Sequence, residues 1–173
     1  MVDVSGQDQI RDARGKFFAM ATTFALGVFN DNFFKQAALL LAVAVGHTDM
    51  QGYALAIFTL PFVALSAPAG WMSDRFPKRM VVIGAKTTEF AAMLFGAAGI
   101  CLGSWLLIFT MLAIMGFQAT FLSPAINGSI PELYPESYIP RANGILRVVV
   151  TAAILLGIAL AGIALDRDEI VYE

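Results

Sequence analysis

The sequence predicts an all-α protein, a polytopic bundle of about five membrane-spanning helices. Of its 173 residues, 58% are hydrophobic and only 14% are charged, and the mean hydropathy is +0.74. A soluble domain usually carries about 25% charged residues, so this chain has too few to cover a water-facing surface. The apolar residues gather in runs of roughly 20, the length at which a helix crosses the hydrocarbon core. The runs lack the period-two alternation of a membrane β-strand.

Five apolar stretches are expected to form the spans, with Gly and polar residues between them. The stretches cover residues 17–44, 52–72, 80–102, 105–126 and 144–165. Residues 1–16 are expected to be a cytoplasmic N-terminal segment, and residues 166–173 a truncated tail. The first stretch is too long for a secretory signal peptide, and Asp31 and Lys35 interrupt its centre.

The positions of Lys and Arg predict the orientation. Basic residues precede the first, third and fifth stretches, whereas the first–second and third–fourth joins contain none. Loops rich in Lys and Arg stay in the cytoplasm. We therefore expect a cytoplasmic N-terminus. The residues that carry this prediction are Arg11, Arg14, Lys16, Arg75, Lys78, Arg79 and Arg141.

Composition also excludes several function classes. The chain has 11 Lys and Arg against 13 Asp and Glu, so it has no basic surface for nucleic acid. One Cys and one His leave no basis for a disulfide framework, a Cys-based metal cluster or a zinc site. We also find no nucleophile with a base and an orienting group, so we expect neither an enzyme nor a cofactor.

Charged residues inside the first stretch are the main candidates for a site. Asp31 lies near its middle, Lys35 follows at i+4 on the same helical face, and Asn30 and Asn32 flank Asp31. A charge at the bilayer centre costs about 2.5–3.5 kcal/mol on insertion scales and is usually functional. Two interpretations stay open: an intrahelical pair that anchors packing, or a site for substrate or a coupling ion.

Later stretches add further polar residues. In the third, Glu89 lies deep enough to face other helices and joins the candidate set, whereas Lys86 is close enough to the cytoplasmic end to snorkel. In the fourth, a polar stripe is either interhelical glue or cavity lining. This stripe comprises Gly116, Thr120, Ser123 and Asn127.

The most specific string lies between the second and third stretches, from Gly70 to Arg79. Its residues indicate a helix end and a tight turn that basic residues hold in the cytoplasm. Here the sequence resembles the major facilitator superfamily, whose signature is G-x-x-x-D-R-x-G-R/K-R/K. The match fails only at Pro77, where the family has glycine. The matching residues are Gly70, Asp74, Arg75, Lys78 and Arg79.

This resemblance implies a fold and a mechanism. The bundle would be the N-terminal half of a transporter with two six-helix halves, which hold substrate between them and rock in alternating access. Asp74 and Arg75 would belong to a cytoplasmic gate. The chain supplies five spans, so the partners implied are the missing C-terminal half of the same protein or a second copy.

A narrower resemblance is to the lysophospholipid transporter branch, including forms fused to acyltransferase modules. Residues 29–35, Phe-Asn-Asp-Asn-Phe-Phe-Lys, resemble the opening of that branch. A second motif is expected in the loop between the fourth and fifth stretches. Its residues are Pro131, Glu132, Arg141, Asn143 and Gly144. The resemblance implies lysophospholipid as the substrate, the bilayer as its source and a bacterial-type inner (plasma) membrane as the location.

Two other functions remain open. One is a facilitator for a small polar solute or drug, coupled to protons through Asp31 or Glu89. The other is a truncated membrane scaffold that binds partners without transport.

Overall fold

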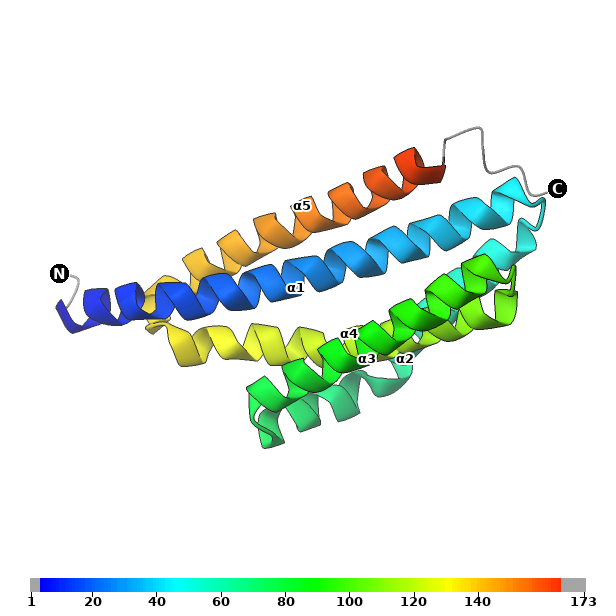
Figure 1. Cartoon of the computed structure of the whole chain (residues 1–173). Helices are drawn as coiled ribbons and strands as arrows, with labels where there is room; N and C mark the ends of the chain where they lie inside the picture. The colour runs from blue at the N-terminus through cyan, green and yellow to red at the C-terminus, as the bar shows by residue number, and fades with distance from the viewer. Residues whose placement is uncertain (1–3, 166–173) are drawn as a thin grey trace.

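The computed structural model describes residues 4–165, which form five α-helices and one short 3-10 helix in an up-and-down arrangement (Figure 1). No strand occurs in this part of the chain. The elements are α1 (Val4–Ala44), α2 (Asp49–Arg75), α3 (Lys78–Cys101), α4 (Trp105–Leu133), η1 (Glu136–Tyr138) and α5 (Ile139–Leu165). The prediction of an all-α helix bundle is confirmed.

Two packing layers meet at α1 and α4. α5 lies along α1, whereas α2 and α3 both pack against α4 (Figure 1). The N-terminal end of α1, the α2–α3 turn and the α4–α5 join lie toward one end of the bundle. The α1–α2 and α3–α4 joins lie at the other. This alternation is the one that the distribution of Lys and Arg predicts.

Glycines end α1 and α3 at the two joins that carry no Lys or Arg. Gly46 follows α1 with φ +76° and Gly103 follows α3 with φ +61°, a left-handed conformation that residues with a Cβ rarely adopt. After Gly46, the His47 amide donates to the Ala42 carbonyl at 2.9 Å. After Gly103, the Ser104 amide donates to the carbonyl of Gly99 at the same distance. These bonds satisfy carbonyls that a helix end otherwise leaves free.

Prolines end helices at the opposite side. Phe76 precedes Pro77, and Tyr134 precedes Pro135. Both have extended backbones, because a residue before proline disfavours the helical conformation.

The helices extend beyond three of the predicted spans. α4 continues past residue 126 to Leu133, α5 begins at Ile139 rather than residue 144, and α1 already begins at Val4. The second motif therefore lies on helices and not in a loop. At the end of α4 the physical reason is that the helix runs beyond its apolar stretch into the polar region and stops at Tyr134, which is extended because it precedes Pro135. The misplaced residues are Pro131 and Glu132 on α4, and Arg141, Asn143 and Gly144 on α5.

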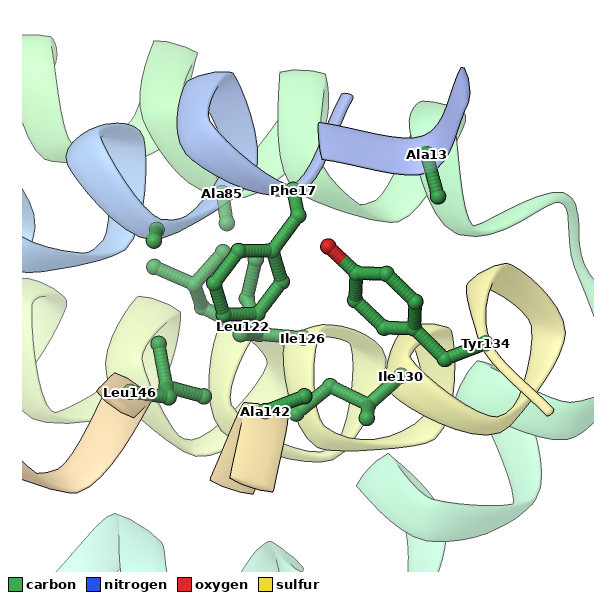
Figure 2. Packing of buried hydrophobic residues seen from close by; sticks show 10 residues of the cluster. Ala13, Phe17, Ala85, Leu122, Ile126, Ile130, Tyr134, Ala142 and Leu146 are labelled. Atoms are coloured by element: carbon green, nitrogen blue, oxygen red, sulfur yellow. The ribbon is translucent and has the colours of Figure 1, made fainter. Parts of the chain in front are cut away.

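Two apolar clusters hold the bundle together. The first joins α1, α4 and α5 near the N-terminal end of α1, with Phe17 and Tyr134 in edge-to-face contact at 5.5 Å between ring centroids (Figure 2). Ile130 and Leu146 complete its packing between α4 and α5. The second cluster lies toward the opposite end and centres on Met111 and its neighbours in α4. Between the two clusters lie the polar residues described below.

Small residues bring particular helix pairs close. A Cβ on Gly157 of α5 would lie 2.7 Å from the carbonyl oxygen of Phe29 on α1. A Cβ on Gly116 of α4 would overlap the backbone of Phe58 on α2. Both glycines are thus required by backbone contact between helices, as small residues at membrane helix interfaces often are.

Within residues 4–165, four segments are long and apolar enough to cross a membrane: α2, α3, α4 and the segment from Glu136 to Leu165. The chain is a multi-pass membrane protein by this measure. α1 has 41 residues but is not one of the four. Asn30, Asp31 and Asn32 lower the hydropathy of its central part, so its passage through the bilayer stays a prediction.

Candidate functional site

A buried carboxylate and a buried amide meet at the centre of the bundle. Asp31 on α1 is 6% exposed and Gln118 on α4 is 1% exposed. The Gln118 Nε2 donates to the two oxygens of Asp31 at 3.1 and 3.4 Å. The other end of the same amide, Oε1, is buried and has no hydrogen-bond partner among residues 4–165. A buried acceptor without a partner is unfavourable, so its retention marks this contact as a candidate site.

Asn30 connects α1 to a second buried carboxylate. The Asn30 Nδ2 donates to Glu89 Oε1 on α3 at 2.9 Å, and Glu89 is 4% exposed. Lys86, one turn before Glu89, forms an ion pair with Glu89 Oε2 at 2.6 Å. Glu89 therefore faces α1, as its depth predicts, and is neutralised within its own helix.

The expectation that Lys86 snorkels toward the cytoplasmic end is wrong. Its ammonium lies over Gly27 of α1, where a Cβ would overlap Lys86 Nζ and lie 3.3 Å from Glu89 Oε2. The absence of a side chain at Gly27 thus leaves room for the ion pair between α1 and α3. The ammonium stays there because Glu89, buried nearby, needs a counter-charge.

Lys35 takes a different direction from Asp31. Its Nζ donates to Asn32 Oδ1 at 3.1 Å and lies 4.8 Å from the ring centroid of Phe58 on α2. The Asn32 amide is itself held, because Nδ2 donates to the Val28 carbonyl at 2.8 Å. No ion pair joins Asp31 and Lys35 in the described structure. The interpretation of these two residues as an intrahelical pair is therefore wrong.

The five candidate residues thus fall into two groups. Asn30 and Asp31 of α1 meet Glu89 of α3 and Gln118 of α4, whereas Lys35 contacts Asn32 of its own helix and Phe58 of α2. Of the ionisable groups, Glu89 is balanced by Lys86, but Asp31 and Lys35 have only neutral hydrogen-bond partners. A charge in a low-dielectric environment strongly favours an opposite charge or a dipole. The arrangement can therefore receive both an anionic and a cationic group.

The polar stripe of α4 does not line this group. Thr120 Oγ1 donates to the Gly116 carbonyl at 2.7 Å, and Asn127 Nδ2 donates to the Ser123 carbonyl at 2.8 Å. The hydrogen-bond donors of these side chains are thus taken up by carbonyls of α4 itself. The residue that reaches Asp31 is Gln118, which the sequence analysis missed. Its only signal was a lone amide within an apolar run.

The string that resembles the family signature lies across the α2–α3 turn. Gly70, Asp74 and Arg75 are in the last turns of α2. Asp74 and Arg75 are exposed, and the Arg75 guanidinium lies 5.4 Å from the ring centroid of Trp71. Arg79 is exposed on α3, and neither it nor Asp74 forms an ion pair in the part of the chain that is described.

Lys78 connects the signature string at the α2–α3 turn to the second motif on α4. It begins α3, and its Nζ donates to the Gly128 carbonyl on α4 at 2.7 Å and forms an ion pair with Glu132. Pro131 precedes Glu132 on the same helix. Arg141, by contrast, lies over the ring of Tyr138 at 5.7 Å. Asn143 and Gly144 are exposed on α5 and do not join this contact.

Comparison with known proteins identifies the family. The model of the Major Facilitator Superfamily matches residues 15–167, which is nearly the whole chain. The chain belongs to the Major Facilitator Superfamily. No solved structure matches it.

Relatives within the superfamily carry a more specific name. The chain is 34% identical over 142 residues to the lysophospholipid transporter LplT of Salmonella enteritidis, of Salmonella newport and of Salmonella typhimurium. The alignment covers 82% of this chain but 34% of each relative. The chain therefore spans about a third of the length of these transporters.

Proposed function

We propose that the chain is the N-terminal part of a major facilitator transporter that moves lysophospholipid across the bacterial inner membrane by alternating access. The family and the names of the similar transporters support this proposal. The single observation that carries it for this chain is the polar group on α1, where a carboxylate and an ammonium lie one turn apart without pairing. A zwitterionic headgroup offers the matching opposite charges.

Asp31 is the residue we assign to the headgroup's ammonium. Asn30, Asn32, Lys35 and Glu89 would surround the headgroup, while the acyl chain stays in the bilayer. Asp31 is covered by Gln118 in this conformation, so binding requires the amide to turn away or α4 to shift. Such a change fits a transporter that alternates between two states, because a ligand favours the state in which its partner is free.

The cytoplasmic residues fit a gate in this mechanism. Asp74, Arg75 and Arg79 are exposed on this half of the bundle, so their side chains are free to meet a second half. We assign that role to the missing C-terminal half of the same protein or to a second copy. Lys78 and Glu132 join α3 to α4 and would keep this end of the half rigid during rocking.

The orientation belongs to the same proposal. The Lys and Arg residues at one end of the bundle support a cytoplasmic N-terminus. The lysophospholipid would then reach the polar group from the surrounding bilayer. No nucleic acid or cofactor takes part.

The experiment that tests the function is uptake of labelled lysophospholipid into membrane vesicles that contain the full-length protein. We expect Asp31→Asn to remove most of the uptake, because the neutral amide cannot balance an ammonium. Asp49→Asn is the matched control, since Asp49 is exposed at the α1–α2 join. Normal uptake by Asp31→Asn at normal protein level would exclude Asp31 from the mechanism.

One observation favours a second candidate, a proton-coupled facilitator for a small solute. Asp31 is buried with a neutral amide as its hydrogen-bond partner, and a carboxylate in such a place can hold a proton. This candidate predicts uptake that follows an imposed pH gradient and stops when an uncoupler is added. Lysophospholipid uptake that changes with neither the pH gradient nor the uncoupler would exclude the proton-coupled candidate.

A further inference from the structure

We infer that Lys35 binds the phosphate oxyanion of the transported lipid. This inference rests on the proposed function and adds to it the residue that recognises the anionic part of the headgroup. The phosphate of a lysophospholipid carries negative charge whatever group is attached beyond it. The site for this charge is therefore separate from the site that we assign to the ammonium at Asp31.

The first argument is that Lys35 has no anionic partner. In the span of chain from residue 4 to 165, its ammonium contacts the neutral oxygen of Asn32 and the face of the Phe58 ring, and none of the ion pairs involves it. An ammonium has three donors, and Asn32 takes one of them. The remaining donors are available to the oxygens of a ligand.

The second argument is that the ammonium is held in place before any anion binds. The Asn32 amide donates to the Val28 carbonyl at 2.8 Å, and this bond presents Asn32 Oδ1 to Lys35 at 3.1 Å. Phe58, from α2, lies 4.8 Å from the ammonium on another side. Because these contacts are neutral, they position the charge without neutralising it. Lys35 is also only half-buried, so a ligand can reach it.

The third argument is that the nearby charges are already engaged. Lys86 of α3 is paired with Glu89, and Asp31 of α1 receives the amide of Gln118 from α4. Lys35 is thus the one cation in the described membrane interior of α1 and α3 that forms no ion pair with a carboxylate. A charge-assisted bond to phosphate is about twice as strong as a neutral one, and it is strengthened where water is scarce.

The test measures binding rather than transport. The purified full-length protein in detergent is titrated with lysophosphatidate, which has a phosphate but no ammonium, and with a monoacylglycerol of the same acyl chain. We expect lysophosphatidate to bind about tenfold more tightly, the effect of one charge-assisted hydrogen bond. Lys35→Gln should abolish that difference while monoacylglycerol binding stays unchanged, and Lys35→Arg should retain it. Lys16→Gln, at an exposed cation before the bilayer, is the matched control.

Each outcome decides the inference. Equal binding of the two lipids by the unmodified chain overturns it without any variant, so a Lys35→Gln protein that fails to fold does not leave it untested. An undiminished difference in Lys35→Gln overturns it as well. A further arm adds inorganic phosphate: if it displaces lysophosphatidate at the concentration at which it binds alone, the site recognises free phosphate and the lipid assignment is wrong. A retained phosphate preference together with absent vesicle uptake would instead contradict the proposed function alone.

Discussion

The side-chain amide of Gln118 on α4 donates to both carboxylate oxygens of Asp31 on α1, at 3.1 and 3.4 Å. Gln118 is 1% exposed and Asp31 is 6% exposed, so the contact is shielded from water and lipid alike. It joins α1 and α4, the two helices on which the others pack. A change in the charge of Asp31 therefore acts directly on the contact between these helices.

Removing Gln118 should leave Asp31 buried without a donor. We expect Gln118→Leu to lower the free energy of unfolding by about 1–3 kcal/mol, the effect of an unsatisfied buried group. The measurement is thermal unfolding in detergent, followed by helical circular dichroism. The double variant Asp31→Leu with Gln118→Leu should recover most of the loss, since no buried polar atom then lacks its partner. Strictly additive losses would show that the two side chains do not interact.

Two glycines of α5 should respond in opposite ways to the same substitution. Gly157→Ala places a methyl group against the backbone of α1, 2.7 Å from the Phe29 carbonyl oxygen, and should destabilise the bundle by about 1–3 kcal/mol. Gly162→Ala meets nothing within 4 Å and should be neutral or stabilising by up to about 1 kcal/mol, because alanine is the better helix former. Unfolding in detergent compares the two. Equal effects would contradict the close contact of α1 and α5.

The ion pair between Lys78 and Glu132 should contribute little at high salt. Glu132 is 66% exposed in its side chain, so we expect Glu132→Gln to reduce stability by less than about 1 kcal/mol at low ionic strength. The difference should vanish near 1 M salt, where charges are screened over about 3 Å. Lys78→Gln should reduce the stability more than Glu132→Gln does, because it also loses the hydrogen bond to the Gly128 carbonyl. Unfolding midpoints at two salt concentrations test both statements.

The orientation can be read from cysteine labelling. The single native cysteine, Cys101, is first replaced by alanine, and one new cysteine is then introduced at Ser104 or at Pro77. A maleimide that cannot cross membranes should label Ser104→Cys in intact spheroplasts and Pro77→Cys only after the membrane is opened. These two positions lie in the α3–α4 and α2–α3 joins. The reverse pattern would invert the predicted topology.

Much of the fold follows from the sequence because helix formation in a membrane is local. Apolar length places a helix, and the backbone bonds within it are satisfied between neighbouring turns. The helix ends at Gly46 and Gly103 are local as well, because the amide of the residue after each glycine donates to a carbonyl five residues earlier. The end of α4 at Leu133 was missed because proline, rather than polarity, ends this helix. The start of α5 at Ile139 was missed because polar residues form its first turns.

The candidate site was only half predictable. Asn30, Asp31, Asn32 and Lys35 are evident as polar residues in an apolar run, and their types indicate a place for charged groups. Their partners are not evident. Lys35 lies at the spacing that suits a pair with Asp31, yet it contacts Asn32 and Phe58 instead.

The sequence by itself determined that this protein is a set of apolar helices, where the charged residues interrupt them and which joins carry the basic residues. Only the tertiary structure decided that Gln118 meets Asp31, that Asn30 meets Glu89 and that Gly27 makes room for Lys86. The physical reason is the difference in sequence separation between the two kinds of contact. Helices form from contacts three or four residues apart, whereas a buried polar group finds its partner on whichever helix packs beside it.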